Sequence, residues 1–184
     1  GLATALGTGA SHVLAVRGVT GVPATGAAVV LNLTATNSSA DTFVTLHPSD
    51  VAAPNASNLN VAAGRTAANL AIVKLSADGK VTVRNERGSV DVIADVVGWF
   101  DTASGDLFHS VAPGRVLDSR LTTGGWNARL DATSPKPLKV RGAGGVRLDA
   151  SAVLANATVT APSTPGYLTV YPTGATVPNA STLN

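Results

Sequence analysis

The sequence contains no cysteine and no methionine, and it has little charge and few aromatic side chains. Without cysteine the chain forms no disulfide and offers no thiolate to a metal. Methionine and cysteine are also the most readily oxidised side chains, so their absence suits a protein exposed outside the cell. Aromatic residues make up 4% of the chain and charged residues 13%. The charged share is about half of that usual in soluble domains.

The charge and the apolar runs exclude several classes of protein. Thirteen basic and 11 acidic residues give a net charge of +2, and no three Lys or Arg residues are consecutive, so no nucleic-acid footprint is visible. The longest apolar runs, near 28–31 and 92–94, are far shorter than the roughly 20 residues that span a bilayer. With 45% apolar residues and low net charge, the chain is not typical of disorder. We predict a folded chain with no membrane span and no nucleic-acid partner.

The chain contains an internal repeat. Residues 1–60 align with residues 125–184 at a constant offset of 124 without a gap, and 22 of the 60 positions are identical. The best-matched segments are Leu14–Gly18 with Leu138–Gly142, Phe43–Pro48 with Tyr167–Pro172, and Pro54–Asn60 with Pro178–Asn184. The pattern predicts one full period, 1–124, followed by the front of the next. Either the polypeptide continues or a neighbouring chain completes the second unit; we expect continuation.

Alternating and β-branched residues predict a series of short strands and no helix. The predicted strands are 12–17, 27–36, 42–47, 57–61, 67–75, 80–84, 90–100 and 115–120. Asp78-Gly79 predicts a tight hairpin between 67–75 and 80–84. Short strands at this spacing predict an all-β fold of antiparallel, sandwich-like repeat domains in tandem.

A polar ladder on the strand 27–36 recurs in the second copy. Asn32, Thr34 and Thr36 align with identical residues at positions 156, 158 and 160, whereas the alternating apolar residues change. One interpretation is a solvated face built from strand-favouring Thr. The other is a contact face, for a glycan or for lateral packing of fibres.

No arrangement of residues in the sequence predicts catalysis or metal binding. His12, His47 and His109 do not lie at metal-ligand spacing, and the first two become Lys136 and Tyr171 in the second copy. There is no Gly-x-Ser-x-Gly elbow, phosphate-binding glycine loop or EF-hand. We predict a protein that is not an enzyme and uses no metal and no cofactor.

Acidic and basic residues near the end of the first period predict a structural ion-pair network. Asp91 and Asp95 lie on one face of a strand and about 13 Å apart at roughly 3.3 Å per residue, which exceeds the carboxylate spacing of glycoside hydrolases. We expect them to pair with arginines and to fix strand register more than to add stability. The predicted network consists of Asp91, Asp95, Arg115, Asp118 and Arg120.

Aromatic rings are the best candidates for contacting a ligand, since a ring offers a sugar a flat apolar face with a polar edge. The candidates are Trp126, Tyr167 and Tyr171, which align with Leu2, Phe43 and His47 in the first copy. These replacements weaken any site required in every repeat. Trp99 and Phe100 end a strand and are predicted to lie in the core.

Four ordered motifs resemble a repeat of secreted and cell-surface proteins of actinobacteria, which occurs in tandem or attached to cell-wall amidases. The motifs are Val29–Thr36, Pro54–Asn60, Asp91–Phe100 and Pro113–Arg120. The resemblance implies that one unit ends near Phe100 and that the next unit begins near Phe108. Residues 1–106 would then form one β repeat domain lacking its N-terminal strand, and residues 107–184 the first part of the next.

These observations favour a non-enzymatic extracellular structural repeat protein, such as a component of a fibre, stalk or surface assembly. Its expected partners are copies of itself or tandem neighbours. The alternative is a carbohydrate- or cell-wall-binding module appended to an exported enzyme, with a cell-wall glycan as its ligand. Tandem copies would raise the avidity of such a module. The loss of ring equivalents between the copies favours the fibre.

Overall fold

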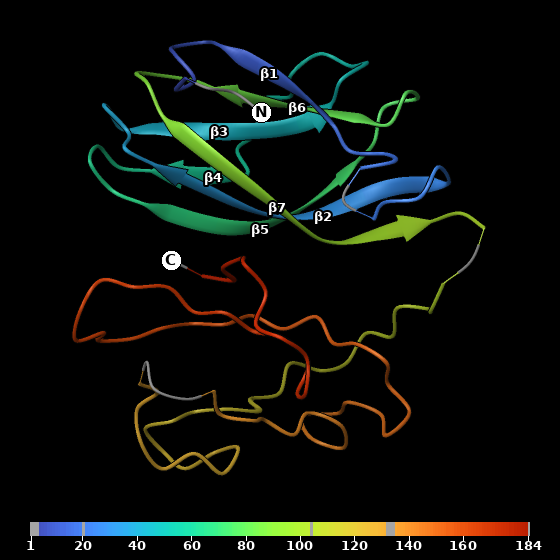
Figure 1. The fold of residues 1–184 in the computed structure, drawn as a ribbon, viewed down its shortest axis with the longest axis vertical. Coiled ribbons are helices and arrows are strands. Elements are labelled where there is room, and N and C mark those ends of the chain that lie inside the picture. Colours follow the sequence, from blue (N-terminus) through green and yellow to red (C-terminus); the bar gives the residue numbers. More distant parts are fainter. Residues whose placement is uncertain (1–3, 20, 104, 132–134, 184) are drawn as a thin grey trace. The chain divides into compact units, whose positions relative to one another are not determined.

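The computed structural model of the chain describes residues 4–19, 21–103, 105–131 and 135–183 (Figure 1). The chain divides into two compact units. The first unit comprises Gly1–Gly105, Val159–Tyr171 and Thr176–Asn184, and the second comprises Asp106–Thr158 and Pro172–Ala175. The predicted boundary after residue 106 stays a prediction about folding units.

Seven β-strands lie between residues 11 and 101. They are β1 (Ser11–Ala15), β2 (Gly26–Thr36), β3 (Thr42–Pro48), β4 (Leu59–Val61), β5 (Ala67–Lys74), β6 (Lys80–Asn85) and β7 (Asp91–Asp101). Every strand pairing is antiparallel, which confirms the predicted all-β antiparallel fold. The described residues form no helix, so no membrane-spanning helix is found among them.

The strands form a four-stranded sheet in the order β1-β6-β3-β4 and a three-stranded sheet in the order β5-β2-β7. Apolar residues at alternate positions fill the space between them, as the period of two along a strand requires. On β2 the inward residues Val29, Leu31, Leu33 and Ala35 are almost fully buried. Burying a side chain of this size contributes roughly 1.5–3 kcal/mol, so β2 is a main source of stability.

The predicted hairpin at Asp78-Gly79 is wrong, although the turn itself is present. Gly79 has a φ of 78°, and its amide donates to the Ser76 carbonyl across 2.9 Å. However, β5 pairs with β2 and β6 pairs with β1 and β3. The turn therefore carries the chain from one sheet to the other, because the apolar faces of β5 and β6 both point into the core.

The predicted strand at 115–120 is also wrong for this structure. The segment forms a single antiparallel bridge, Asp118 to Thr123, closed by a hydrogen bond of 3.0 Å from the Leu121 amide to the Asp118 carbonyl. A strand needs a neighbour for its backbone groups, and among the described residues Val116 and Leu117 have no strand beside them.

A β-bulge interrupts the alternation predicted for β7. Val30 pairs with Gly98 whereas Leu31 pairs with Val96, so Val97 is an extra residue. The bulge exchanges the faces of the residues that follow, so Trp99 pairs with the inward-facing Val29. The side chains of Trp99 and Phe100 are 46% and 47% exposed, so the prediction that they lie in the core is wrong. They lie near the end of β7, which is an edge strand of its sheet.

A hydrogen-bonded turn recurs at the offset of 124 residues that relates the two copies of the sequence. The Gly18 amide donates to the Val22 carbonyl, and the Gly142 amide donates to the Val146 carbonyl; both distances are 2.8 Å. Gly18 and Gly142 also share a left-handed backbone, with φ of 76° and 78°. These two turns lie in different units, so the local sequence is enough to form this turn.

The corner after β3 recurs as well. The Thr45 hydroxyl donates to the Ala56 carbonyl across 2.7 Å, and the aligned Thr169 hydroxyl donates to the Ala180 carbonyl across 3.0 Å. The Leu46 amide donates to Asn58 Oδ1, and the aligned amide of residue 170 donates to Thr182 Oγ1. A hydroxyl thus replaces a side-chain amide as acceptor, while the corner keeps its geometry.

Candidate functional site

The polar ladder on β2 is buried. Asn32 and Thr34 are 2% and 3% exposed, although they face away from the core residues Leu31 and Leu33 in the strand register. The solvated-face interpretation is therefore wrong for these two residues. Asn32 Nδ2 donates to the Ser181 carbonyl across 2.5 Å. The interpretation of the ladder as a contact face stays a prediction. In this structure the group that Asn32 contacts is a backbone carbonyl of the same chain.

The third residue of the ladder behaves differently. Thr36 is partly exposed, and its hydroxyl lies 2.7 Å from the hydroxyl of Thr66. The amide of Asn37, the next residue, donates from Nδ2 to Asp91 Oδ2 across 2.9 Å. This end of the ladder is held by local partners from the loop before β5 and from β7.

The three candidate sugar-contacting rings fall in both units. Tyr167 and Tyr171 belong to the first unit, and Trp126 belongs to the second. Trp126 Nε1 donates to the Pro137 carbonyl across 3.0 Å, which fixes its ring on the backbone of its own unit. Tyr167 is 75% exposed. Leu2, the residue aligned with Trp126, lies outside the described residues.

The structure brings together three members of the predicted ion-pair network, namely Asp118, Arg115 and Arg120. Asp118 Oδ2 lies 2.8 Å from Arg115 Nη1 and 2.8 Å from Arg120 Nη2. Hydrogen bonds from the Arg120 side chain, then from its backbone amide, hold the pKa of Asp118 far below its ordinary value of 3.8. Asp91 and Asp95 lie on β7 in the first unit. Their predicted pairing with these arginines stays a prediction.

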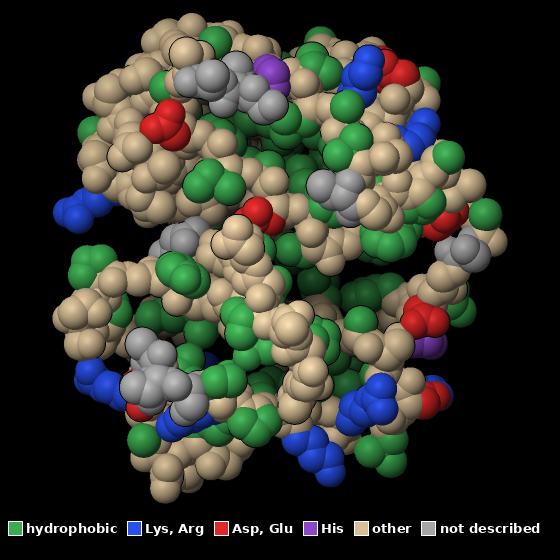
Figure 2. Space-filling model, in the orientation of Figure 1, with side chains coloured by type: hydrophobic (Ala, Val, Ile, Leu, Met, Phe, Trp, Pro, Cys, Tyr) green, Lys and Arg blue, Asp and Glu red, His purple; other side chains and the backbone are tan. Residues whose placement is uncertain are grey.

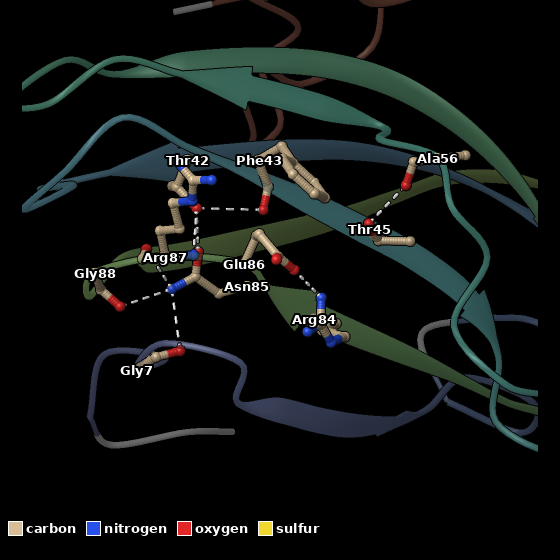
Figure 3. Close-up of polar contacts among 10 residues, drawn as sticks. All are labelled: Gly7, Thr42, Phe43, Thr45, Ala56, Arg84, Asn85, Glu86, Arg87 and Gly88. Atoms are coloured by element: carbon tan, nitrogen blue, oxygen red, sulfur yellow. Dashed lines mark hydrogen bonds and ion pairs between the residues drawn. The ribbon is translucent and has the colours of Figure 1, made fainter.

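A buried asparagine at the end of β6 organises a polar cluster near the core (Figure 3). Asn85 is fully buried. Its Nδ2 donates to the carbonyls of Leu6, Gly7, Arg87 and Gly88, at 2.9–3.1 Å. Its Oδ1 accepts from Thr42 Oγ1 across 2.8 Å, and that hydroxyl accepts from the Arg87 amide.

Asn85 therefore ties the N-terminal segment, the start of β3 and the loop before β7 to one point. Buried polar atoms that are fully paired stabilise a unique arrangement, whereas an unpaired one is costly. Asn85 was not among the residues predicted from the sequence. An asparagine at a strand end is typical of a turn, so nothing in the sequence separates Asn85 from the exposed asparagines.

A cavity of about 520 Å³ opens near the turn between β5 and β6. Its lining includes Arg17, Asp50 and Lys74 but no aromatic residue. Arg17 is engaged by its own fold, since Nη2 and Nη1 donate to the carbonyls of Gly26 and Ala77. Asp50 Oδ2 accepts from the Ala77 amide. Arg17 and Asp50 thus hold loops together, and none of the predicted sugar-stacking rings lines this cavity.

The histidines take no shared position in the part of the chain that the structure describes. His47 is buried on β3, and its Nδ1 lies 2.9 Å from the Pro48 carbonyl. His12 lies half-buried on β1, and His109 is exposed in the second unit. No group of three His, Asp or Glu side chains among the described residues is arranged to hold a metal ion.

Charge is sparse on the surface as well as in the sequence. On the face drawn in Figure 2, the described Lys, Arg, Asp and Glu side chains are scattered, and uncharged groups cover most of the area. Ion pairs on the described surface join residues that are close in sequence, such as Arg147 with Asp149 and Lys80 with Asp78. Exposed pairs of this kind contribute about 0–1 kcal/mol.

The chain was compared with known proteins at three levels. No protein-family model matches it, and neither a curated protein nor a solved structure gives a match.

Proposed function

We propose that this chain is part of a non-enzymatic structural repeat protein that works outside the cell, in a fibre, stalk or surface assembly. One observation carries the proposal: the sequence period of 124 residues coincides with a recurrence of hydrogen-bonded turns at the same offset. The two copies share turns that shape a β unit but differ in ring and histidine side chains, as suits a spacer better than a binding site.

The physical character of the unit supports the same function. In the first unit, two antiparallel sheets enclose an almost purely aliphatic core. Repeats of this kind, joined by short segments, behave as a semi-rigid string in which each unit contacts its neighbours. The exposed surface is poor in charge, and it carries apolar side chains on β5 and β7 such as Ile72 and Val97. Such surfaces favour association.

The extracellular location and the family are part of this proposal. They are supported by the motifs Val29–Thr36, Pro54–Asn60, Asp91–Phe100 and Pro113–Arg120, which resemble the secreted actinobacterial repeat, and by the absence of Cys and Met from the sequence. Such a protein would sit at the cell surface and project or assemble there.

Electron microscopy of the native material, first in negative stain and then in ice, tests the proposal. We expect filaments or a lattice with an axial spacing that fits one or two β units. Isolated, flexible beads at all concentrations would contradict it. A variant with Leu33→Ala, which opens the core of the first unit, serves as the control: an assembly built from folded units should lose its order.

A second candidate function is binding of a cell-wall glycan, and the exposed ring of Tyr167 favours it. A glycan array and a pull-down on purified cell wall test this directly. Retention on cell wall that Tyr167→Ala abolishes and that Tyr167→Phe preserves would favour the binding module. Retention that neither substitution changes would exclude a role for this ring.

A further inference from the structure

One side of the sandwich is incompletely closed. Of the apolar residues that face the core, those on β2, β3 and β6 are buried, whereas those on β1 and β7 are only partly buried. The partly buried ones on these two strands are Leu14, Val92, Ala94 and Val96. The other two partly buried apolar residues packed against the core are Ala10, just before β1, and Ala67 on β5, so most of the incomplete burial lies at β1 and β7.

These two strands are the free edges of their sheets on the same side. β4 contacts β5 across the core, so the other ends of the two strand orders, β1 and β7, lie opposite that contact. Leu6, just before β1, forms a bridge with Val90, just before β7. An 11-residue edge strand with apolar groups, such as β7, is a surface that natural proteins normally cover.

The second unit shows what packs at the equivalent place. Leu138 aligns with Leu14, and the turn at 140–146 aligns with the turn at 16–22. A Cβ added at Gly144 would lie 2.7 Å from Val116 Cγ1, and one added at Gly114 would lie 2.8 Å from the Cα of Gly144. The segment Gly114–Asp118 therefore lies directly against this turn, with no room for a side chain at either glycine.

The same segment also reaches the counterpart of β1. A Cβ added at Gly124 would lie 2.5 Å from the Val116 carbonyl oxygen, 3.0 Å from Leu138 Cδ1 and 3.2 Å from Leu117 Cδ1. Gly124 also has a left-handed backbone, with a φ of 81°. Glycine therefore fits this position because it has no side chain and because it adopts this φ without strain. Leu117 and Leu138 thus meet around a glycine that directly precedes the start of the second copy.

We propose that the open side of the first unit, between β1 and β7, is the docking site for a strand of the Gly114–Asp118 type. The occupant is the copy of this segment that directly precedes the unit in a longer array. Its Val and Leu side chains would cover Leu14 and the inward residues of β7. The inference rests on the tandem array of the proposed function, and it explains why the sequence predicts a strand at 115–120 that here has no partner.

The test adds the segment to the whole chain. Residues 107–124 are placed before Gly1, since Gly124 normally precedes the residue that aligns with Gly1. We expect the melting temperature of the first unit to rise by at least about 5 °C, and hydrogen exchange of β1 and β7 amides to slow at least tenfold. The matched control carries the same extension with Val116→Asp and Leu117→Asp in the added copy, and should show neither effect.

Two further variants show where the segment docks. In the extended chain Leu14→Ala should remove at least half of the gain in melting temperature, whereas Val13→Ala, on the opposite face of β1, should leave it. An equal gain from both extensions, or no gain from either, would overturn the proposal. Protection that appears only in dimers would also overturn it, in favour of exchange between chains. Electron microscopy of the native material tests the array separately, so failure of either proposal can be recognised.

Discussion

The same strand pattern occurs twice in this chain, with two outcomes. Residues 26–36 form β2, the central strand of its sheet, whereas the aligned residues 150–160 form no strand. Both segments alternate in the same way, and Asn32, Thr34 and Thr36 have identical counterparts. β2 has β5 and β7 as neighbours, and their counterparts would lie beyond residue 184. The comparison shows that alternation permits a strand but that neighbours create it.

The turns give the opposite lesson. The turn closed by Gly18 and Val22 recurs at Gly142 and Val146 with the same distance, even though the surrounding strands are present in one copy and absent from the other. A turn with glycine in the left-handed region is decided by a few local residues. Turns therefore form from local sequence, and sheets form when distant segments are available.

The largest expected effect comes from giving β2 the core residues of the second copy. Leu31 and Leu33 align with Ala155 and Ala157, so the double variant Leu31→Ala, Leu33→Ala should lose about 6 kcal/mol, at roughly 3 kcal/mol for each buried leucine. That approaches the whole stability of a typical domain. Urea unfolding followed by Trp99 fluorescence, in a Trp126→Phe background, reports the first unit.

The matched control for this prediction is Leu154→Ala. Leu154 aligns with Val30 and is exposed, so the free energy of unfolding should change by less than about 0.5 kcal/mol. A loss of less than about 2 kcal/mol for the double variant would contradict the view that inward residues of β2 hold the first unit together.

The next largest effect is expected at Asn85. Asn85→Ala removes the donor shared by four carbonyls and leaves the Thr42 hydroxyl only the Phe43 carbonyl, at 3.5 Å, as acceptor. Since unpaired buried groups cost about 1–3 kcal/mol each and several share one donor here, we expect a loss of about 3 kcal/mol. Asn69→Ala, at an exposed asparagine with one hydrogen bond from Nδ2 to the Asn58 carbonyl, should cost less than about 1 kcal/mol. Equal costs would show that the Asn85 cluster is not special.

A smaller effect should separate local strain from packing. Asn37 and its aligned residue Ala161 both have a left-handed backbone, with φ of 52° and 47°. Asn37→Ala should cost about 1–2 kcal/mol, since alanine tolerates this region poorly and the bond to Asp91 is lost. Asn37→Gly keeps the backbone relaxed and loses the bond alone, so its cost should be clearly lower. Ala161→Gly, for the same reason, should slow hydrogen exchange in the second copy's turn.

Much of the first unit could be predicted from sequence, and the failures have physical causes. Each of the seven strands overlaps a predicted segment, since period-two alternation requires nothing but the chain itself. The pairing of β5 with β2 rather than with β6 could not be predicted, because the turn at Asp78-Gly79 fits a hairpin and a sheet-to-sheet crossing equally well. The bulge at Val97 depends on register with β2, which a single strand does not reveal.

The candidate site could be predicted less well than the fold. Asp118, Arg115 and Arg120 were predicted to belong to one network, but the sequence assigned the arginines to Asp91 and Asp95, whereas in the structure both arginines pair with Asp118. The burial of Asn32 and Thr34 was not predicted, because a Thr-rich strand face usually meets water and the covering segment is distant in sequence. Asn85 was also missed, because three of its partners, Leu6 and Gly7 before β1 and Thr42 at the start of β3, are distant from it in sequence.

The smallest expected effect is a pH dependence of the turn at Asp118 in the second unit. Hydrogen bonds from Arg120 and then Arg115 lower the pKa of Asp118 in the folded state. A carboxyl whose folded pKa is lowered stabilises the fold above its unfolded pKa, near 3.8, and loses that contribution as the pH falls through the folded value. Hydrogen exchange of the Leu121 amide, which bonds to the Asp118 carbonyl, should therefore show turn opening that increases below about pH 4, after correction for the intrinsic exchange rate.

In Asp118→Asn the opening should be greater at pH 6 and change little with pH. The Gly18–Val22 turn of the first unit has no such carboxylate in its hydrogen bond, so its amide is the internal reference. Parallel pH dependence of both turns would mean that the acid acts on the whole chain, and the contrast between locally and distantly determined structure would not hold for this hairpin.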